Sequence, residues 1–312
     1  MLDLTVHDLI IIGAGPAGMS AALYAARQNM DFLLIAEKKG GYANYIEELR
    51  TFPGITFLSG FGLMKSFSDQ LEECKVPIND GEEVRSVKAA KHGFLVTTDI
   101  GQYLAKAVIA ASGRKFKRLG IKGEKEFNGR GVGYCGVCDS AMHPNKTIVI
   151  IGGGHSGLFA AYAMMKIADK VIIIEKGIVE TTGKVKEVSK LVRSSPNVKI
   201  IKGEALEILG DNHANGVKVR LNSGGSENVY ADYVYIQVGY TPNADFLKGF
   251  VKLNVDDEII IDKDNQASVK GIFAAGDATD VPEKQLIVAM GEGAKAALSA
   301  INYLSAAPRA SL

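Results

Sequence analysis

A glycine-rich segment occurs twice in this chain of 312 residues, and it constrains the fold more than any other feature. Residues 11–25 read IIGAGPAGMSAALYA, and residues 150–164 read IIGGGHSGLFAAYAM. In each copy an apolar run predicts a strand, a GxGxxG pattern follows it, and small residues continue as a predicted helix. Strand, glycine loop and helix in this order are typical of a dinucleotide-binding unit.

An acidic residue follows each glycine loop at a similar distance. Glu37 ends the apolar run LLIAE, and Glu175 ends VIIIE. In dinucleotide-binding units an acid roughly 20 residues past the loop accepts hydrogen bonds from a ribose. Because both copies have strand, loop, helix and acid in register, we predict an α/β fold of two Rossmann-like dinucleotide-binding domains with redox chemistry.

The glycines of each loop have separate expected roles. The first permits the tight turn, the second lets the backbone approach a pyrophosphate, and the third lets helix and strand pack closely. The pyrophosphate then lies at the helix N-terminus, where free N–H groups favour an anion. The predicted loops consist of Gly13, Ala14, Gly15, Pro16, Ala17 and Gly18 in the first copy, and of Gly152, Gly154 and Gly157 in the second.

Composition excludes several other classes of protein. The net charge of +1 argues against a nucleic-acid binder that relies on bulk charge, and 47% hydrophobic with 23% charged residues is typical of a globular chain. Three cysteines cannot form the disulfide framework of a small secreted domain. No apolar run reaches the length of a membrane span, and no basic leader precedes the first strand, so we expect a cytoplasmic protein without a membrane partner.

Two of the cysteines form a CxxC pair, Cys135 and Cys138, which Asp139 follows directly. Half a zinc site is one interpretation, although neither a second CxxC nor a His pair supplies the remaining ligands. A structural disulfide is another, although it is unusual in a cytoplasmic chain. We favour a redox-active dithiol with Asp139 as a proton donor or acceptor, and we expect Cys74 to be a buried spare thiol.

A further acid lies at the end of a predicted strand. Residues 107–113 (AVIAASG) and 271–280 (GIFAAGDATD) are apolar runs that end in small residues. A buried strand does not require an acid at its C-terminal end. We therefore expect Asp277 to hold a ligand hydroxyl, and we expect residues 286–304 to form a helix packed closely on a sheet or ligand.

The chain resembles the low-molecular-weight thioredoxin reductases, which are FAD-containing pyridine nucleotide-disulfide oxidoreductases. The resemblance covers nearly the whole length. Its most specific motif is the CxxCD that stands between GRGVG and the second glycine loop; the other matching segments are IIGAGPAGMSAALYAAR, VGYTPN, GIFAAGDATD and KQLIVAMGEGAKAA.

The resemblance implies a discontinuous FAD-binding domain, residues 1–116 and 240–312, with an NAD(P)H-like domain of residues 117–239 inserted into it. The inserted domain carries the CxxC and rotates about two linker strands. Cys138 is then the thiol nearest the flavin, with Cys135 as its disulfide partner. Besides the first loop, the implied FAD-binding residues are Glu37, Lys38, Gly41, Tyr42, Thr51, Val84, Gly113, Gly276, Asp277, Lys284, Gln285 and Leu286.

The implied reaction passes electrons from FAD to the Cys135–Cys138 disulfide and on to thioredoxin or a thioredoxin-like protein, in a homodimeric enzyme. A FAD-dependent dithiol oxidase that forms disulfides in small molecules with oxygen is an alternative enzyme class. A flavin redox sensor that a partner protein reads is the non-enzymatic alternative.

The sequence departs from the family where NADPH-using members carry a basic cluster. Glu175 and Lys176 stand there instead, and a carboxylate repels the 2′-phosphate of NADPH. Three electron donors therefore stay open: NADH bound through Glu175, a pyridine-nucleotide-independent donor such as ferredoxin or reduced deazaflavin, and weak use of NADPH through Lys176. Tyr42 and Thr51 also replace the family's usual Gln and Asn, and Tyr42 either stacks on the flavin or fills volume.

Overall fold

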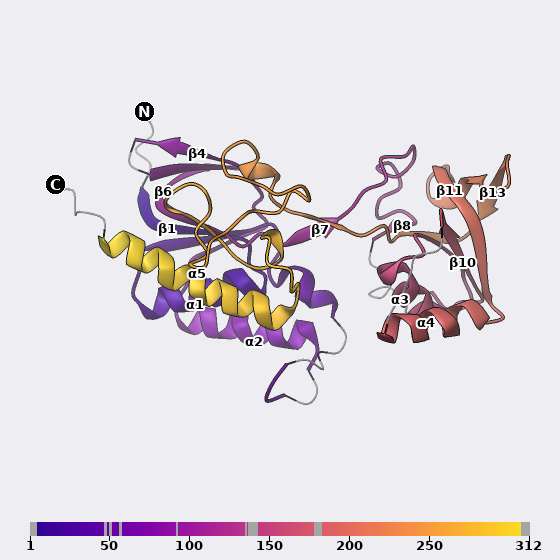
Figure 1. Cartoon of the computed structure of the whole chain (residues 1–312), viewed down its shortest axis with the longest axis horizontal. Helices are drawn as coiled ribbons and strands as arrows, with labels where there is room; N and C mark the ends of the chain where they lie inside the picture. The colour runs from indigo at the N-terminus through magenta and orange to yellow at the C-terminus, as the bar shows by residue number, and fades with distance from the viewer. Residues whose placement is uncertain are drawn as a thin grey trace. The chain divides into compact units, whose positions relative to one another are not determined.

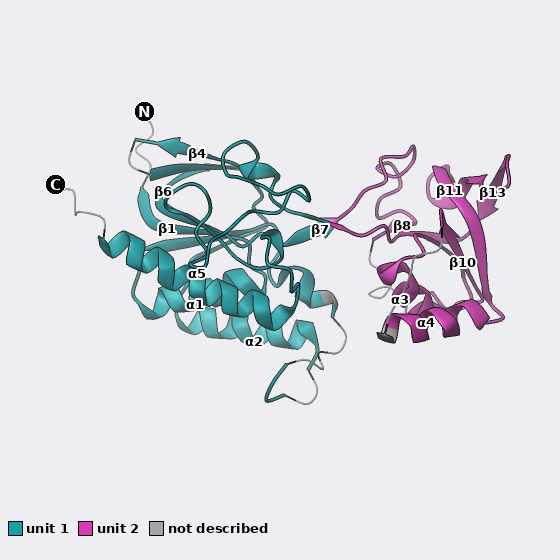
Figure 2. Ribbon diagram, viewed as in Figure 1, with its two compact units in different colours: residues 1–115, 241–312 teal, residues 116–240 magenta. Residues whose placement is uncertain are grey.

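The computed structural model describes residues 5–46, 49, 52–55, 58–91, 93–134, 136, 143–177 and 183–306. The chain divides into two compact units, each discussed by itself below. Unit 1 combines Met1–Lys115 with Thr241–Leu312, and unit 2 is Phe116–Tyr240 (Figure 2). Where the chain passes between the units, β7 (Arg114–Phe116) and β15 (Tyr240–Pro242) pair as a two-stranded sheet.

Unit 1 is built on a seven-stranded sheet in the order β3-β2-β1-β6-β5-β4, with β16 paired to β6 (Figure 1). Strands β3, β2, β1, β6 and β16 run parallel, whereas β4, β5 and β6 form an antiparallel meander. Its strands are β1 (Val6–Ile12), β2 (Phe32–Ala36), β3 (Ile78–Asp80), β4 (Val84–Ala90), β5 (Gly93–Thr98), β6 (Gln102–Ala110) and β16 (Ile272–Ala274). Its helices are α1 (Pro16–Arg27), α2 (Gly60–Glu73) and α5 (Leu286–Ala306), with short 3₁₀ turns at Gly41–Tyr45, Asp245–Leu247 and Gly276–Ala278.

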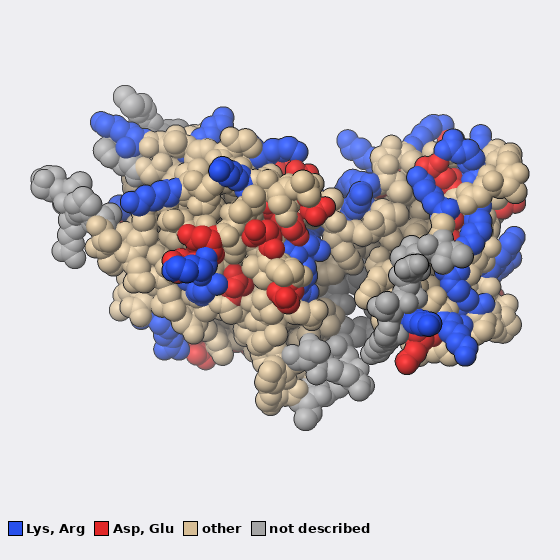
Figure 3. All heavy atoms as spheres, viewed as in Figure 1, with Lys and Arg blue, Asp and Glu red and all other residues tan. Residues whose placement is uncertain are grey.

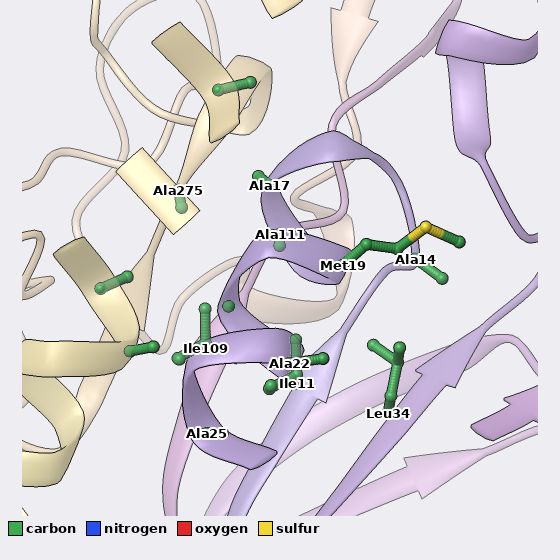
Figure 4. Close-up of a cluster of buried hydrophobic side chains, with 14 of the residues drawn as sticks. Ile11, Ala14, Ala17, Met19, Ala22, Ala25, Leu34, Ile109, Ala111 and Ala275 are labelled. Carbon is green, nitrogen blue, oxygen red and sulfur yellow. The ribbon is translucent and has the colours of Figure 1, made fainter. Parts of the chain in front are cut away.

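The core of unit 1 forms two layers because successive residues of a strand face opposite sides of the sheet. Leu9 and Ile11 of β1 belong to a buried cluster with residues of α1, α2 and α5. Figure 4 shows Ile11 beneath Ala22 of α1. Ile10 and Ile12 face a second cluster formed by β4, β5 and the segment 244–278. A strand that is covered on both faces is apolar at every position, which explains the uninterrupted apolar run at the start of the chain's first repeat.

Unit 2 repeats this arrangement on a seven-stranded sheet in the order β13-β12-β11-β10-β9-β14-β8. Ile148 and Ile150 of β9 pack against α3 and α4, whereas Val149 and Ile151 pack under the hairpin strands β11, β12 and β13. The elements are β8 (Val132–Gly133), β9 (Thr147–Ile151), α3 (His155–Met164), β10 (Lys170–Glu175), α4 (Gly183–Ser194), β11 (Val198–Gly210), β12 (Ala214–Leu221), β13 (Ser226–Tyr230) and β14 (Tyr233–Ile236).

The observed sheets and helices confirm the predicted α/β fold with two Rossmann-like units. The predicted C-terminal helix is present as α5. Cys74 is the C-terminal cap of α2 and is only partly buried, since its neighbours Glu73 and Lys75 at the end of the helix are exposed, so the expectation of a buried thiol is wrong. Among the helices that the structure describes, none is both long enough and apolar enough to cross a membrane.

Two glycines of α5 give a direct test of the packing in unit 1. A Cβ added at Gly293 would overlap the backbone carbonyl of Ala17 in α1, whereas a Cβ at Gly291 would have nothing within 4 Å. We expect Gly293→Ala to destabilise the protein by about 2 kcal/mol through overpacking. Gly291→Ala is expected to stabilise it by about 0.5–1 kcal/mol, because alanine favours the helix.

Chemical denaturation of both variants measures these two changes. Equal effects of the two substitutions would contradict the close packing of α5 on α1.

Candidate functional site

The first glycine loop has the geometry that its sequence predicts. Gly13 has φ +102°, which favours glycine, and a Cβ there would overlap the carbonyl of Ala111. A Cβ at Gly18 would overlap the carbonyl of Gly13, so the start of α1 lies directly against the end of β1. A Cβ at Gly15 would meet nothing within 4 Å. The second glycine therefore faces open space at a helix N-terminus that no side chain caps.

The second glycine loop in unit 2 has the same geometry. Gly152 has φ +118° and lies against the carbonyl of Gln237. Gly157 lies against the carbonyl of Gly152, and Gly154 faces open space at the uncapped start of α3. Both loops can therefore accept the phosphate groups of a dinucleotide.

Other predicted residues of unit 1 lie around the first loop. The Gly40 N–H donates to the carbonyl of Ala14 at 2.7 Å, and a Cβ at Gly41 would lie 3.2 Å from the Cα of Gly15. Tyr42 follows in the same 3₁₀ turn and is partly buried. These contacts bring the predicted residues Gly41 and Tyr42 to the phosphate loop, whereas Thr51 lies outside the described residues.

Glu37, the predicted ribose acid, lies close to the segment that leads to Val84, another implied FAD-binding residue. Glu37 and Lys38 are the first two residues after β2, and both are exposed. The Glu82 N–H donates to the carbonyl of Ala36 at 3.0 Å, which brings the segment leading to Val84 beside Glu37. This edge of the sheet can therefore hold a ribose through an exposed carboxylate and an adenine through backbone groups.

Asp277 lies beside the first turn of α1. Its neighbour Gly276 has φ +74°, and a Cβ there would lie 3.0 Å from the Cβ of Ala17. Within the described part of the chain, the Asp277 carboxylate has no hydrogen-bond partner. Burial raises its pKa, although the cations Arg114 and Lys284 favour the charged form. A partly buried acceptor without a protein partner fits a ligand that brings its own hydroxyl groups.

The remaining predicted residues of unit 1 have mixed positions. Gly113 has φ +65° and its carbonyl accepts from the N–H of Asn243 at 2.9 Å. Lys284 does not extend freely toward a ligand, because its ammonium pairs with Glu258 at 2.8 Å. Gln285 is exposed directly before α5, and Leu286 packs against the core as the first residue of that helix.

The carboxylate of Glu175 at the end of β10 is bound by two cations. Arg193 donates to it at 3.1 and 2.9 Å from α4, and Lys202 donates from β11. Burial disfavours the charged carboxylate, but these hydrogen bonds outweigh it and keep the pKa of Glu175 below its usual value. Both cations lie far along the chain from Glu175, so nothing in the neighbouring residues indicated them.

The CxxC cysteines and Asp139 lie outside the described residues, but their neighbours are placed. Gly136, between the cysteines, lies against Ala160 and Met164 of α3, since a Cβ there would approach their side chains at 2.8 and 3.4 Å. Within the described residues no cluster of three or more His, Cys, Asp and Glu side chains could hold a metal ion.

Tyr134, directly before Cys135, is fixed at both ends. Its hydroxyl donates to the buried Glu124 carboxylate at 2.8 Å, and its carbonyl accepts from the Gln237 amide at 2.7 Å. Its ring packs on Phe116, with centroids 5.6 Å apart, and Phe116 packs in turn on Tyr240. Burial first, and then the Glu124 carboxylate, raise the pKa of Tyr134 far above its usual value. Sequence reasoning missed this residue because most of its partners are distant in the chain.

Tyr134→Phe tests this anchorage. It removes the hydroxyl from Glu124 but keeps the ring on Phe116, so we expect a loss of about 2 kcal/mol, the usual value of a hydrogen bond to a charged group. Chemical denaturation measures it. Tyr230→Phe, at a position 66% exposed, is the matched control and is expected to change stability by less than about 0.5 kcal/mol. Equal small effects at both positions would contradict the anchorage.

Comparisons with known proteins bear on these sites. The profile of the family described as pyridine nucleotide-disulphide oxidoreductase matches residues 7–293. The chain is 34% identical over 301 residues to a subunit of the alkyl hydroperoxide reductase of Staphylococcus aureus, and 34% identical over 305 residues to an NADH dehydrogenase of Bacillus subtilis. These alignments cover 96% and 97% of the chain but only 59% of each relative, so the chain spans about three fifths of their length.

Solved structures match over almost their full length. The thioredoxin reductase of T. acidophilum has 35% identity and a TM-score of 0.80, and the match covers 95% of this chain and 98% of that one. A ferredoxin-flavin thioredoxin reductase from Clostridium acetobutylicum has 28% identity and a TM-score of 0.55, over 97% and 98% of the two chains. Family and structural neighbours together imply FAD as the cofactor. The open first loop fits it, as does Asp277, whose carboxylate has no hydrogen-bond partner among the described residues. The chain belongs to the pyridine nucleotide-disulphide oxidoreductase family.

Proposed function

We propose that the protein is a thioredoxin reductase, in which electrons from FAD reduce the Cys135–Cys138 disulfide and the resulting dithiol reduces a thioredoxin-like protein. The observation that carries this proposal is the CxxC segment itself. It lies between the anchored Tyr134 and β9, in a unit whose glycine loop repeats that of unit 1. The thioredoxin reductases among the structural neighbours support the same assignment.

In this proposal the residues of unit 1 hold the cofactor. The first loop receives the pyrophosphate at Gly15, the exposed Glu37 accepts the ribose hydroxyls, and Asp277 accepts hydroxyls of the ribityl chain. FAD supplies two-electron transfer when it is bound. Gly276 keeps Asp277 against α1, so the pyrophosphate and ribityl positions are fixed by the same helix.

The cysteines carry the electrons to the acceptor. Two electrons and two protons convert the Cys135–Cys138 disulfide into two thiols. One thiolate then attacks the disulfide of the acceptor, and the second thiol releases the mixed disulfide, so the acceptor leaves as a dithiol. Asp139 donates or accepts the proton of the adjacent thiol. Anchorage of Tyr134 fixes the entry of the chain into this segment.

In this proposal the enzyme is not selective for NADPH as its electron donor. The reason is Glu175, whose side chain is only 2% exposed and whose carboxylate is already bound by Arg193 and Lys202. A ribose diol would therefore have to displace a cation. This favours a donor such as ferredoxin or reduced deazaflavin over NADH, and the ferredoxin-flavin enzyme among the structural neighbours is consistent with it.

Asp277→Asn tests the cofactor role of the acid. Burial raises the Asp277 pKa above 3.8, so the folded, FAD-free chain loses stability as the pH rises from that value through the raised pKa. We therefore expect FAD-free Asp277→Asn to be more stable than FAD-free parent protein at neutral pH but not at pH 3. The same variant should retain FAD less tightly by about tenfold.

Denaturation of FAD-free protein across pH and equilibrium dialysis of FAD measure both effects. A variant that binds FAD as tightly as the parent would argue against the role of Asp277 at the cofactor.

Cys138→Ser tests the order of the two thiols. The parent enzyme, reduced anaerobically with two electrons, should show long-wavelength absorbance from a thiolate beside the flavin, and Cys138→Ser should lose it. Cys135→Ser is the matched control and should retain the band without the need for reduction. The opposite pattern would assign Cys135 as the thiol nearest the flavin.

The donor is tested by anaerobic bleaching of the flavin with NADPH, NADH, reduced ferredoxin and reduced deazaflavin in parallel. We expect rapid bleaching by at least one of the last two and slow bleaching by NADPH. Rapid bleaching by micromolar NADPH would contradict the interpretation of Glu175.

A further inference from the structure

Two cations, Arg193 and Lys202, bind the carboxylate of Glu175 at the end of β10 in unit 2. Arg193 approaches the Glu175 carboxylate with two N–H groups at 3.1 and 2.9 Å, and Lys202 binds one of the same oxygens. A paired guanidinium and an ammonium are the groups that proteins use to bind phosphate. Glu175 therefore fills the place that an external anion would take.

This site lies directly beneath the second glycine loop. A Cβ at Gly153 would overlap Oε2 of Glu175, and Gly153 stands between the turn glycine Gly152 and the open glycine Gly154. In a dinucleotide-binding unit the end of the second strand faces the 2′ position of the adenosine ribose. The carboxylate thus occupies the place of a ribose 2′ substituent.

Exposure differs between the acid and its partners. The Glu175 side chain is 2% exposed, whereas Arg193 and Lys202 are 29% and 43% exposed. The two cations can therefore reach a ligand from solvent, but a ribose diol cannot reach the acid without displacing one of them. Their exposure also means that removal of Glu175 leaves no charge buried.

The surroundings of the site are cationic. Lys176 and Arg220 both pair with the single carboxylate of Glu204, on the strand that carries Lys202. Figure 3 shows Lys and Arg side chains gathered over the region of β10, β11 and α4. An added dianion would therefore meet an excess of positive charge once Glu175 is absent.

We propose that Glu175 acts as an internal substitute for the 2′-phosphate of NADPH and that Arg193 and Lys202 form a latent 2′-phosphate site. This inference rests on the proposed function, and it makes Glu175 the residue that decides which nucleotide unit 2 accepts. The carboxylate excludes NADPH by occupying its phosphate position. Arg193 excludes NADH by occupying the hydrogen-bond acceptors that a ribose diol requires.

The proposal predicts opposite effects of removing the acid and removing its main partner. Glu175→Ala frees two cations for a phosphate, so it favours the phosphorylated nucleotide alone. Arg193→Ala frees one edge of the carboxylate for a ribose diol, so it favours the unphosphorylated nucleotide. Glu175→Ala combined with Arg193→Ala leaves neither a full phosphate site nor an acceptor.

Binding of NADP⁺ and NAD⁺ to the FAD-loaded enzyme, measured by isothermal titration calorimetry at low salt, tests this. Oxidised nucleotides avoid electron transfer, so the readout does not depend on turnover. We expect Glu175→Ala to raise the affinity for NADP⁺ at least about tenfold over the parent, with NAD⁺ little changed. Arg193→Ala should raise the affinity for NAD⁺, and the double variant should lose the gain for NADP⁺.

Two further variants serve as controls. Glu204→Ala also frees two cations, but these pair at Glu204 rather than beneath the glycine loop, so we expect no gain for NADP⁺. Glu175→Gln removes the charge but keeps the side-chain volume in the phosphate position, so it should raise NADP⁺ affinity less than Glu175→Ala. Thermal melting and the FAD content check that every variant is folded.

Unchanged NADP⁺ affinity in folded Glu175→Ala would overturn the proposal, as would an equal gain in Glu204→Ala. Reduction of thioredoxin by dithionite-reduced enzyme is measured separately. Its failure would count against the proposed function, whereas the nucleotide titrations alone decide the role of Glu175.

Discussion

The close approach of a helix to the end of a strand, made possible by two glycines, is the constraint on which both units depend. Gly18 lies against the carbonyl of Gly13, and Gly157 lies against that of Gly152. Any side chain at the third glycine would push the helix away and close the space in front of the second. In unit 1 the pyrophosphate position and the packing of α1 therefore both follow from this contact, and Gly276 places Asp277 beside the same helix.

The two units differ in the charge placed at the ribose end of this arrangement. In unit 1 the acid Glu37 is exposed, whereas in unit 2 Glu175 is buried and bound by Arg193 and Lys202. Unit 1 therefore has an exposed carboxylate at the ribose end, whereas the carboxylate of unit 2 is paired with two cations of the same unit. A duplicated binding unit can in this way retain its fold while its ligand preference changes.

The fold was predictable because its signals are local. Apolar runs, glycine spacing and terminal acids each lie within a single βαβ unit, and the parallel pairs β1–β2 and β9–β10 follow from them. The antiparallel strands β4, β5, β12 and β13 carry no such local signal and were not predicted. The partners of three site residues were not predictable, since each approaches from a distant element. Glu175 is bound by Arg193 and Lys202, Tyr134 by Gln237, and Lys284 by Glu258. The sequence indicated a free negative charge at Glu175, and the tertiary contacts instead make that position an ion-paired one.

The central claim, that electrons leave this protein through the cysteine pair to a thioredoxin-like disulfide, is tested most directly by the second half of the reaction. Enzyme reduced by dithionite, with excess reductant removed, is mixed anaerobically with oxidised thioredoxin while flavin absorbance and protein thiols are followed. We expect the flavin to reoxidise as two thiols appear per thioredoxin, and neither change when Cys135 and Cys138 are both replaced by Ser. A flavin that stays reduced until oxygen is admitted, with thioredoxin still oxidised, would contradict it.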